Sequence, residues 1–386
     1  MSNILWNMIK PFKVDISNKI LEDIYLKVES YSWHEMPEDG GWNYGTNLDY
    51  MKEISKYWLD KFDWKKTEEK INKFQNFKSN IDDIDIHFIH QKGSGDSPKP
   101  LLLSHGWPGS IIEFLHIIDK LSHPEKHGGK KEDSFDVIVP SLPGFGFSGR
   151  PSKPIGPRKM ASIFNSLMVN ELGYEKYIAQ GGDFGGTIAT WLAYDFPKSL
   201  LGIHINILIT RHPDGPQTKE EKEWQERFKI EQRIEDGYRT QQATKPQTLS
   251  YAMMDSPVGV AAWIIEKMRG WSDIKNEDIE SIYSKDILLS NIMIYLVTKT
   301  FNTASWIYYG RRIEGGRSLP KEHLPLKVPT AAAIFPKEYL EWAPRSYVER
   351  IYNIQRWTEM PKGGHFAALE QPDLLVKDIR DFAKTL

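Results

Sequence analysis

The stretch QGGDFGGTIATW, residues 180–191, places a single aspartate between two pairs of glycines. A short apolar run ends just before it, and a helical pattern begins just after it. Such a turn is typical of a nucleophile elbow, in which a strained strand-to-helix corner lifts one reactive side chain above a sheet. Gly181 and Gly185 flank Asp183 at the positions where a β-carbon would clash. The competing interpretation is an ordinary helix N-cap, which an aspartate stabilises by roughly 1 kcal/mol.

The usual residue at the tip of this turn is serine, whereas here it is an acid. A carboxylate needs no base to deprotonate it, and its attack on carbon forms an ester. The sequence therefore favours Asp183 as a nucleophile, provided that the other residues of the site follow in the expected order.

Strand-like and helix-like segments alternate around the turn. Apolar runs that read as strands begin near residues 85, 100, 135, 176, 200, 328 and 351, and helical patterns cover 111–121 and 371–384. This alternation predicts an α/β fold with a mainly parallel sheet flanked by helices.

Residues 210–326 interrupt the alternation with amphipathic helices, so we expect a helical lid inserted into a core of residues 85–209 and 327–386. Residues 1–84 are polar, aromatic and rich in lysine, with helical patterns at 20–30 and 47–62. We expect them to form a separate N-terminal segment.

Composition excludes several classes of protein. With 50 basic and 52 acidic residues the formal charge is −2, so nothing favours nucleic acid as a partner. The absence of cysteine excludes disulfides and thiol nucleophiles. The N-terminal sequence has no apolar signal-like region, and no long apolar run follows. We therefore expect a soluble cytoplasmic protein without a membrane anchor, and a homodimer is one option for its assembly.

Two motifs look like cofactor or metal sites but do not fit them. GFGFSG, residues 144–149, matches a dinucleotide fingerprint, but Pro151 and Pro154 follow it and prevent the helix that the fingerprint must open. His87 and His90 lie three apart on a predicted strand, hence on opposite faces. We expect neither a cofactor nor a metal.

Partners for the nucleophile follow in the order of an elbow hydrolase, which is nucleophile, acid, histidine. His365 lies in a glycine loop between the last strand and the final helix. Glu338 lies at the end of the preceding strand, with Glu341 as an alternative. The loop SHGWPGS, residues 104–110, follows an early strand, so the backbone amides of Trp107 and Phe184 are the expected oxyanion donors.

With these residues assembled, the chain resembles the microsomal-type epoxide hydrolases of the α/β-hydrolase fold along nearly its whole length. The core and lid motifs that carry the resemblance are HGWPGS (105–110), GGDFGG (181–186), DSPVGVAAWIIEK (255–267) and GGHFAALEQPDLL (363–375). The N-terminal motifs are IKPFKVDIS (9–17), YGTNLDYMKEISKYW (44–58) and FDWKKTEEKINKFQNFK (62–78). The mammalian members of this family carry an N-terminal membrane anchor that we do not find here.

The resemblance implies Asp183 as nucleophile, His365 as base and Glu338 as the acid that orients it. It also implies two lid tyrosines that activate the epoxide. The first matches Tyr238 in EDGYRTQQ (235–242), and the second falls in SWIYYGRR (305–312), where Tyr309 fits better than Tyr308. The expected substrates are water and an apolar epoxide, since aromatic lid residues (Trp263, Trp271, Trp306) favour bulky apolar molecules. Detoxification, lipid signalling and biosynthesis are all open as roles.

Two other functions compete with this one. A haloalkane dehalogenase uses the same nucleophile, but it commonly places a tryptophan directly after it to hold the halide, and here that residue is Phe184. A binding protein of the same fold without catalysis is the non-enzymatic alternative, which the complete set of Asp183, Glu338 and His365 disfavours.

Overall fold

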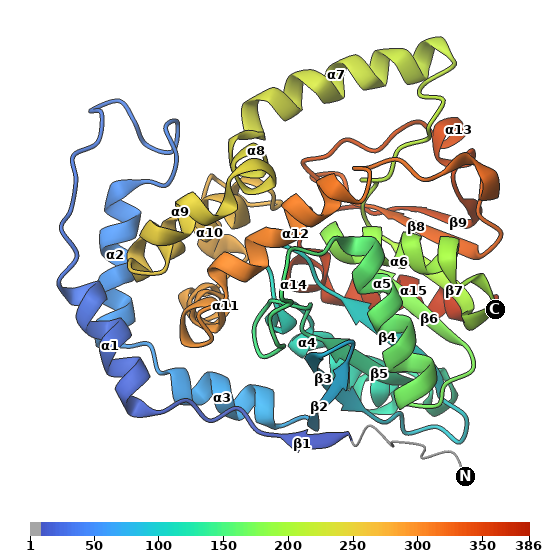
Figure 1. The fold of residues 1–386 in the computed structure, drawn as a ribbon, viewed down its shortest axis with the longest axis horizontal. Coiled ribbons are helices and arrows are strands. Elements are labelled where there is room, and N and C mark those ends of the chain that lie inside the picture. Colours follow the sequence, from blue (N-terminus) through green and yellow to red (C-terminus); the bar gives the residue numbers. More distant parts are fainter. Residues whose placement is uncertain (1–8) are drawn as a thin grey trace.

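The structure, a computed structural model, describes residues 9–386 and has one nine-stranded sheet at its centre (Figure 1). The strand order is β1-β2-β3-β5-β4-β6-β7-β8-β9, and from β5 to β9 every neighbouring pair is parallel. The strands are β1 (Lys10–Phe12), β2 (Asn76–Ile81), β3 (Ile84–Gln91), β4 (Lys99–Ser104), β5 (Phe135–Pro140), β6 (Tyr177–Gly181), β7 (Leu200–Ile205), β8 (Pro329–Ile334) and β9 (Asn353–Glu359). This confirms the predicted α/β fold.

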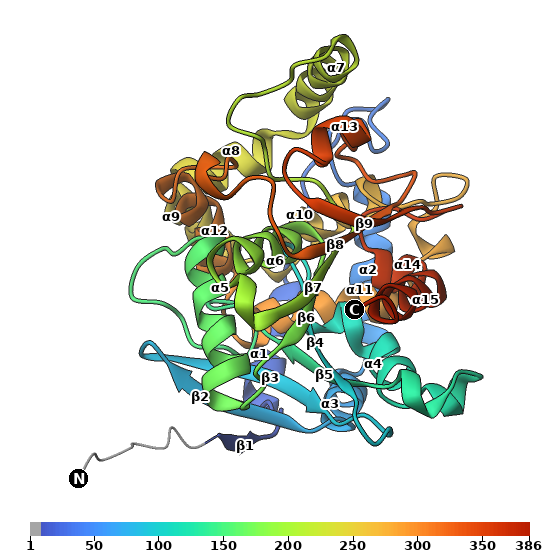
Figure 2. The same ribbon diagram turned by 90° about the vertical axis from the view of Figure 1, so that its right-hand side faces the viewer.

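Helices cover both faces of the sheet, so its central strands are buried on both sides (Figure 2). On one face α5 (Pro157–Ser166) packs against α6 (Asp183–Asp195), and on the other α4 (Leu115–Ser122) packs against α15 (Pro372–Ala383). Two short helices, α13 (Arg345–Val348) and α14 (Ala367–Glu370), complete the core.

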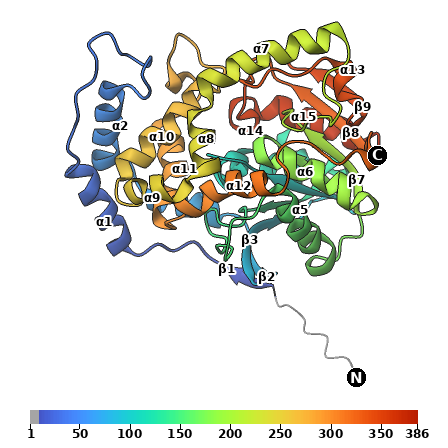
Figure 3. The ribbon, with the colours of Figure 1, turned by 45° about the horizontal axis from the view of Figure 1, so that its top comes forward.

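Six helices between β7 and β8 form the lid, which lies across the end of the sheet where α6 begins (Figure 3). They are α7 (Lys219–Glu235), α8 (Gly237–Thr244), α9 (Pro246–Met253), α10 (Pro257–Gly270), α11 (Lys285–Val297) and α12 (Phe301–Ile313). The chain enters and leaves the lid side by side. The amide of Arg211 donates to the carbonyl of Arg317 at 2.9 Å, and Arg211 bridges to Ser318 in parallel orientation.

The N-terminal segment wraps the lid and also joins the sheet. Its helices α1 (Asn18–Glu29), α2 (Leu48–Asp60) and α3 (Trp64–Asn72) contact lid helices α10 and α11. Strand β2 pairs antiparallel with β3 and β1 pairs antiparallel with β2, an extension of the sheet that the sequence did not predict. Asp82 and Asp83 both have positive φ, as a two-residue hairpin turn between β2 and β3 requires.

Within residues 9–386, no helix combines the length and apolar character that crossing a bilayer needs. The expectation of a chain without a membrane anchor falls partly on residues 1–8, which lie outside the described residues.

Candidate active site

A sharp strand-to-helix corner is present at Asp183. Strand β6 ends at Gly181, Gly182 caps the following helix, and Asp183 is the first residue of α6 with a φ of +45°. A non-glycine residue with positive φ is held there by its surroundings at a cost of about 1–3 kcal/mol, and such strain clusters at functional sites. The carboxylate is therefore held at this corner rather than free to relax.

Close packing explains the glycines on either side of the acid. A β-carbon at Gly181 would lie 2.2 Å from the carbonyl carbon of Gly185, and one at Gly185 would lie 1.8 Å from the carbonyl oxygen of Ser104. A β-carbon at Gly106 would lie 2.3 Å from the Asp183 side chain itself. Both the corner and the loop after β4 thus need glycine in order to approach each other.

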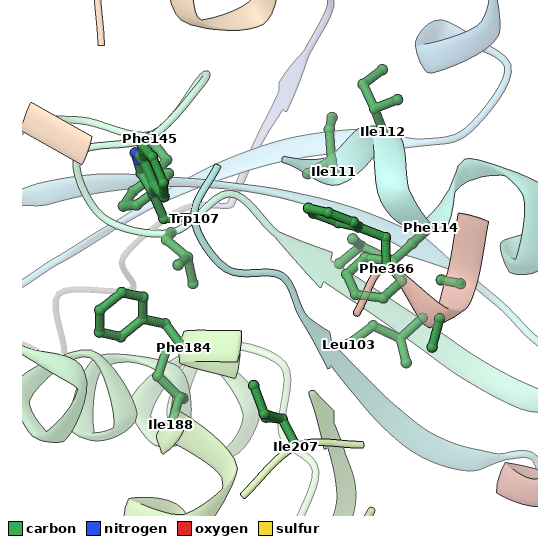
Figure 4. Close-up of a cluster of buried hydrophobic side chains, with 14 of the residues drawn as sticks. Leu103, Trp107, Ile111, Ile112, Phe114, Phe145, Phe184, Ile188, Ile207 and Phe366 are labelled. Carbon is green, nitrogen blue, oxygen red and sulfur yellow. The ribbon is translucent and has the colours of Figure 1, made fainter. Parts of the chain in front are cut away.

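The loop after β4 supplies a hydrogen-bond donor to the acid. The amide of Trp107 donates to Asp183 Oδ1 at 2.8 Å. The amide of Phe184, the second predicted donor, forms no hydrogen bond with the carboxylate in the described chain. Figure 4 shows the buried apolar side chains around this corner, including Trp107 from the loop and Phe184 and Ile188 from α6.

The predicted acid and histidine lie together at the same place. His365 Nε2 lies 3.7 Å from Asp183 Oδ2. Its other ring nitrogen, Nδ1, contacts both oxygens of Glu338 at 2.9 and 3.0 Å. The alternative acid, Glu341, lies elsewhere and pairs with Arg227 at 2.7 Å. Glu338 is thus the carboxylate that the structure brings to the imidazole.

The electrostatics of His365 follow from these neighbours. Burial lowers the pKa of the imidazole, but the carboxylates of Glu338 and Asp183 outweigh burial and raise the pKa to about 9. Below that pH the ring carries a proton as long as the Asp183 carboxylate is charged. Loss of the Asp183 charge would remove part of what holds the proton.

The first lid tyrosine also reaches the site. Tyr238, in α8, stacks on the Trp107 ring with 5.1 Å between centroids, and its hydroxyl lies 3.1 Å from that of Tyr339. Burial and then the charge of Asp183 raise the pKa of Tyr238, so the phenol keeps its proton and can donate it in a hydrogen bond.

The second tyrosine is a correction to the sequence analysis, because the structure brings Tyr308 rather than Tyr309 to the site. The Tyr308 ring packs edge-on against Phe184 and Trp107, with centroids 4.8 and 5.7 Å away, and its hydroxyl is buried without a hydrogen-bond partner. Tyr309 points to the outer side of α12, where it is only half-buried and has the guanidinium of Arg312 over its ring at 4.8 Å. Neighbouring side chains on a helix diverge, so only one of the pair can face the corner.

A half-buried acid that the sequence analysis missed lies beside the nucleophile. Glu113 lines a cavity of about 20 Å³ together with Asp183, His365, Gln180 and other residues. Burial and the charge of Asp183 raise the pKa of Glu113 to about 8, against an opposing effect of His365. The cavity has room for one water molecule, which needs roughly 10–15 Å³ and several polar partners. Glu113 falls in HGWPGSIIE (105–113), three residues after the loop 104–110, and only that proximity could have indicated it.

Aromatic rings form the wall next to the histidine. Tyr339, also missed, stacks on Trp271 with centroids 4.3 Å apart, and Trp271 in turn lies edge-on to His365 at 5.0 Å. Of the three predicted lid tryptophans, Trp271 is fully buried at the site, whereas Trp263 and Trp306 are half-buried. The wall is therefore apolar, with phenol groups at its edge.

A second, larger groove lies away from the candidate catalytic residues. This groove of about 1160 Å³, lined by residues that include Tyr194, His323 and Tyr352, contains none of the candidate catalytic residues. The candidate catalytic residues Asp183 and His365 line the small cavity instead. Among residues 9–386, no group of three or more metal-binding side chains comes together.

Comparisons with known proteins agree on one family. Residues 9–114 match the family model described as epoxide hydrolase N terminus, and residues 99–289 match that of the alpha/beta hydrolase fold. A putative epoxide hydrolase from Stigmatella aurantiaca is 38% identical, over 98% of this chain and 85% of that protein. Epoxide hydrolase 1 from Oryctolagus cuniculus is 37% identical, over 97% of this chain and 88% of that protein. The crystal structure of juvenile hormone epoxide hydrolase from the silkworm Bombyx mori superposes with a TM-score of 0.88 at 28% identity, covering 98% of this chain and 95% of that one.

Proposed function

Because this chain belongs to the epoxide hydrolase family, we propose that it opens an apolar epoxide through a covalent ester on Asp183 and releases a vicinal diol. Addition of water to an epoxide is the reaction of the family, and the route through the ester is the proposal. The observation that carries it is the position of His365, which lies next to both Asp183 and Glu338. The other oxygen of Asp183 already accepts a hydrogen bond from the Trp107 amide.

The first step is attack by the carboxylate. Asp183 Oδ1 is held by the Trp107 amide, so Oδ2 is the oxygen free to bond to an epoxide carbon. The carbon–oxygen bond of the ring breaks, and the hydroxyls of Tyr238 and Tyr308 donate to the leaving oxygen. Donation is needed because an alkoxide is a poor leaving group, and a positioned acid typically accelerates such a step about 10²- to 10⁴-fold. The product is an alkyl ester on Asp183.

Ester formation prepares the second step. It removes the negative charge of Asp183, which is one of the groups that raise the pKa of His365. The imidazole then gives up its proton more readily, that proton neutralises the alkoxide formed in the first step, and His365 becomes a base while Glu338 keeps Nδ1 oriented. His365 takes a proton from a water molecule, which attacks the carboxyl carbon of Asp183.

The cavity beside Glu113 supports this second step, since it is lined by both Asp183 and His365 and has the size of one water. The oxyanion that develops on Oδ1 is met by the amides of Trp107 and Phe184. Loss of one such donor typically raises a barrier by about 3–4 kcal/mol. Collapse breaks the ester between the carboxyl carbon and the alkyl oxygen, which takes up the proton that His365 removed from water, so the diol leaves with an oxygen from Asp183.

The substrate side of the site supports an apolar epoxide. The rings of Trp107, Tyr238, Trp271 and Tyr308 pack against one another beside the acid, and the phenol hydroxyls are polar groups among them. A cytoplasmic location and a homodimer stay predictions of the sequence.

A single turnover in ¹⁸O-labelled water tests the ester. With enzyme in excess, the first diol should carry no label, because its new oxygen comes from Asp183, and diol from later turnovers should be labelled. Label in the first diol would mean that water attacks the epoxide directly, and Asp183 would lose its role. As a control, His365→Gln should accumulate enzyme whose mass has increased by that of the epoxide, since alkylation does not need the base but hydrolysis does.

A further inference from the structure

Four arginines gather where the lid joins the core, directly behind the lid tyrosines. We call Arg211, Arg239, Arg311 and Arg317 the arginine cluster. Arg311 follows Tyr308 on α12 by one helical turn, and Arg239 follows Tyr238 on α8. Arg211 and Arg317 are held together by the backbone hydrogen bond that pairs the two ends of the lid.

Arg311 connects the cluster to the candidate active site. Its guanidinium carbon lies 4.9 Å from the centroid of the Phe184 ring and 5.6 Å from that of Tyr308. The residue is only 6% exposed, and in the described part of the chain its guanidinium makes neither a hydrogen bond nor an ion pair. A buried cation that contacts only rings leaves its five N–H donors without protein acceptors.

The rest of the cluster is also short of negative charge. Arg239 pairs with Asp236, but no carboxylate of residues 9–386 forms an ion pair with Arg211 or Arg317. Arg211 donates to the carbonyls of Leu208 and Thr210, and its buried Nη2 has no partner. Arg317 meets only the side-chain oxygen of Gln232, after the amide is turned to face it.

Apart from Asp183, whose charge acts on Arg311, the acids nearby are engaged elsewhere. Glu314 accepts the amides of Gly156, Arg158 and Lys159, Glu235 pairs with Lys267, and Glu341 pairs with Arg227. Consistent with uncompensated charge, burial and then the like charges of the other three arginines lower the pKa of Arg317 to about 9. Burial likewise lowers the pKa of Arg211 to about 10.

Buried charges without partners are costly, and proteins normally pair them. On these grounds, and resting on the proposed function, we propose that the arginine cluster binds the anionic end of the substrate, and that the substrate class is epoxides whose apolar chain ends in a carboxylate. The epoxide then lies before Asp183 between the tyrosines, the apolar chain passes the rings of Phe184 and Tyr308, and the carboxylate meets Arg311. A planar guanidinium matches a carboxylate in both charge and shape.

A different explanation is that the cluster only tunes the tyrosines. A cation beside Tyr308 opposes the rise of its pKa, which would make the phenol a better proton donor to any epoxide. The two explanations differ in what they predict for a neutral substrate, because tuning affects every epoxide and an anion site affects only the charged one.

The experiment compares an aliphatic epoxide ending in a carboxylate with its methyl ester. In the wild type, kcat/KM should favour the acid, and added salt should reduce that preference. Arg311→Gln and Arg317→Gln should each lower kcat/KM for the acid about 10- to 100-fold more than for the ester, mostly through KM. Arg312→Gln is the matched control, since Arg312 is exposed and contacts the Tyr309 ring outside the site.

An equal loss for acid and ester would overturn the anion site in favour of tuning, and so would a wild type that prefers the ester. A second measurement covers variants that fail to fold. A saturated carboxylate of the same chain length should bind wild-type enzyme in calorimetry and compete with the epoxy acid, whereas its methyl ester should bind at least about tenfold less tightly. Equal binding of the two would contradict the proposal. Because this ligand has no epoxide, its binding tests the cluster even if the proposed chemistry fails.

Discussion

At the scale of single residues, the site depends on which side of a helix each group faces. Asp183, Glu338 and His365 could be found from sequence because each follows a strand or sits in a glycine turn, and those positions are set by local signals. Tyr308 could not be separated from Tyr309 by the motif alone. The helical spacing of the apolar residues does favour Tyr308, since Ala304, Tyr308 and Arg311 lie on one face of α12 and are all buried.

Replacing each tyrosine of the doublet by phenylalanine measures this difference. Tyr308→Phe should slow formation of the alkyl–enzyme by about 100-fold, because it removes a donor to the leaving oxygen. Tyr309→Phe should change the rate less than about twofold, since its ring lies under Arg312 outside the site. Rapid mixing with an excess of enzyme gives the alkylation rate directly. Equal effects in the two variants would remove Tyr308 from the reaction.

The half-buried acid Glu113 should give the fold a pH dependence. Its pKa of about 8 in the folded state lies above the usual 4.5, so between these values the folded state holds a proton that the unfolded chain has lost. Raising the pH through this range therefore lowers the free energy of unfolding of the wild type. Glu113→Gln cannot ionise, so its free energy of unfolding should not fall in this way.

We expect the midpoint of urea unfolding of Glu113→Gln to exceed that of the wild type at pH 9, and the two to converge near pH 4.5. A constant difference between the variants at both pH values would show that Glu113 ionises normally in the folded protein.

At the scale of elements, the position of α12 decides whether Tyr308 and Arg311 reach the core. Gly310 lets this helix touch the loop before α5, because a β-carbon there would lie 2.1 Å from the backbone of Ile155. Gly310→Ala should therefore push α12 outward and destabilise the protein by about 1–3 kcal/mol. Activity should fall along with stability.

The matched control is Gly270→Ala near the end of α10, where a β-carbon meets nothing within 4 Å. Chemical unfolding and diol formation measure the two variants side by side. If Gly310→Ala retains full activity, contact between α12 and that loop does not position Tyr308.

The strands predicted from apolar runs are present, but β1 and β2 were missed for a physical reason. Their sequences, KPF and NFKSNI, are largely polar, because β1 lies at the edge of the sheet and β2 lies next to it, where one apolar face suffices. Pairing determines their structure: β2 pairs with β3 across the two-residue turn, and β1 pairs with β2 more than 60 residues away, which leaves no local pattern for β1.

At the scale of the whole molecule, the N-terminal segment ties the lid to the core. Trp58 in α2 is completely buried, and α2 contacts lid helices α10 and α11. Trp58→Ala should lower the free energy of unfolding by about 3–5 kcal/mol, as loss of a large buried ring does. Limited proteolysis should then cut the lid sooner than in the wild type.

Leu59→Ala is the control, because Leu59 is the next residue and 40% exposed. It should leave both the unfolding free energy and the proteolysis pattern nearly unchanged. A lid in Trp58→Ala that resists protease as well as in the wild type would mean that the segment does not hold it.

Because Arg211 pairs with Arg317 and Ser318, the two ends of the lid lie side by side, and the lid can be removed or replaced at one junction. A short linker across that pair would close the chain without interrupting any strand of the sheet. Lids could accordingly be traded between relatives at this junction. In such a chimaera the lid tyrosines and the substrate selectivity would come from one parent, and the nucleophilic aspartate and the histidine would come from the other.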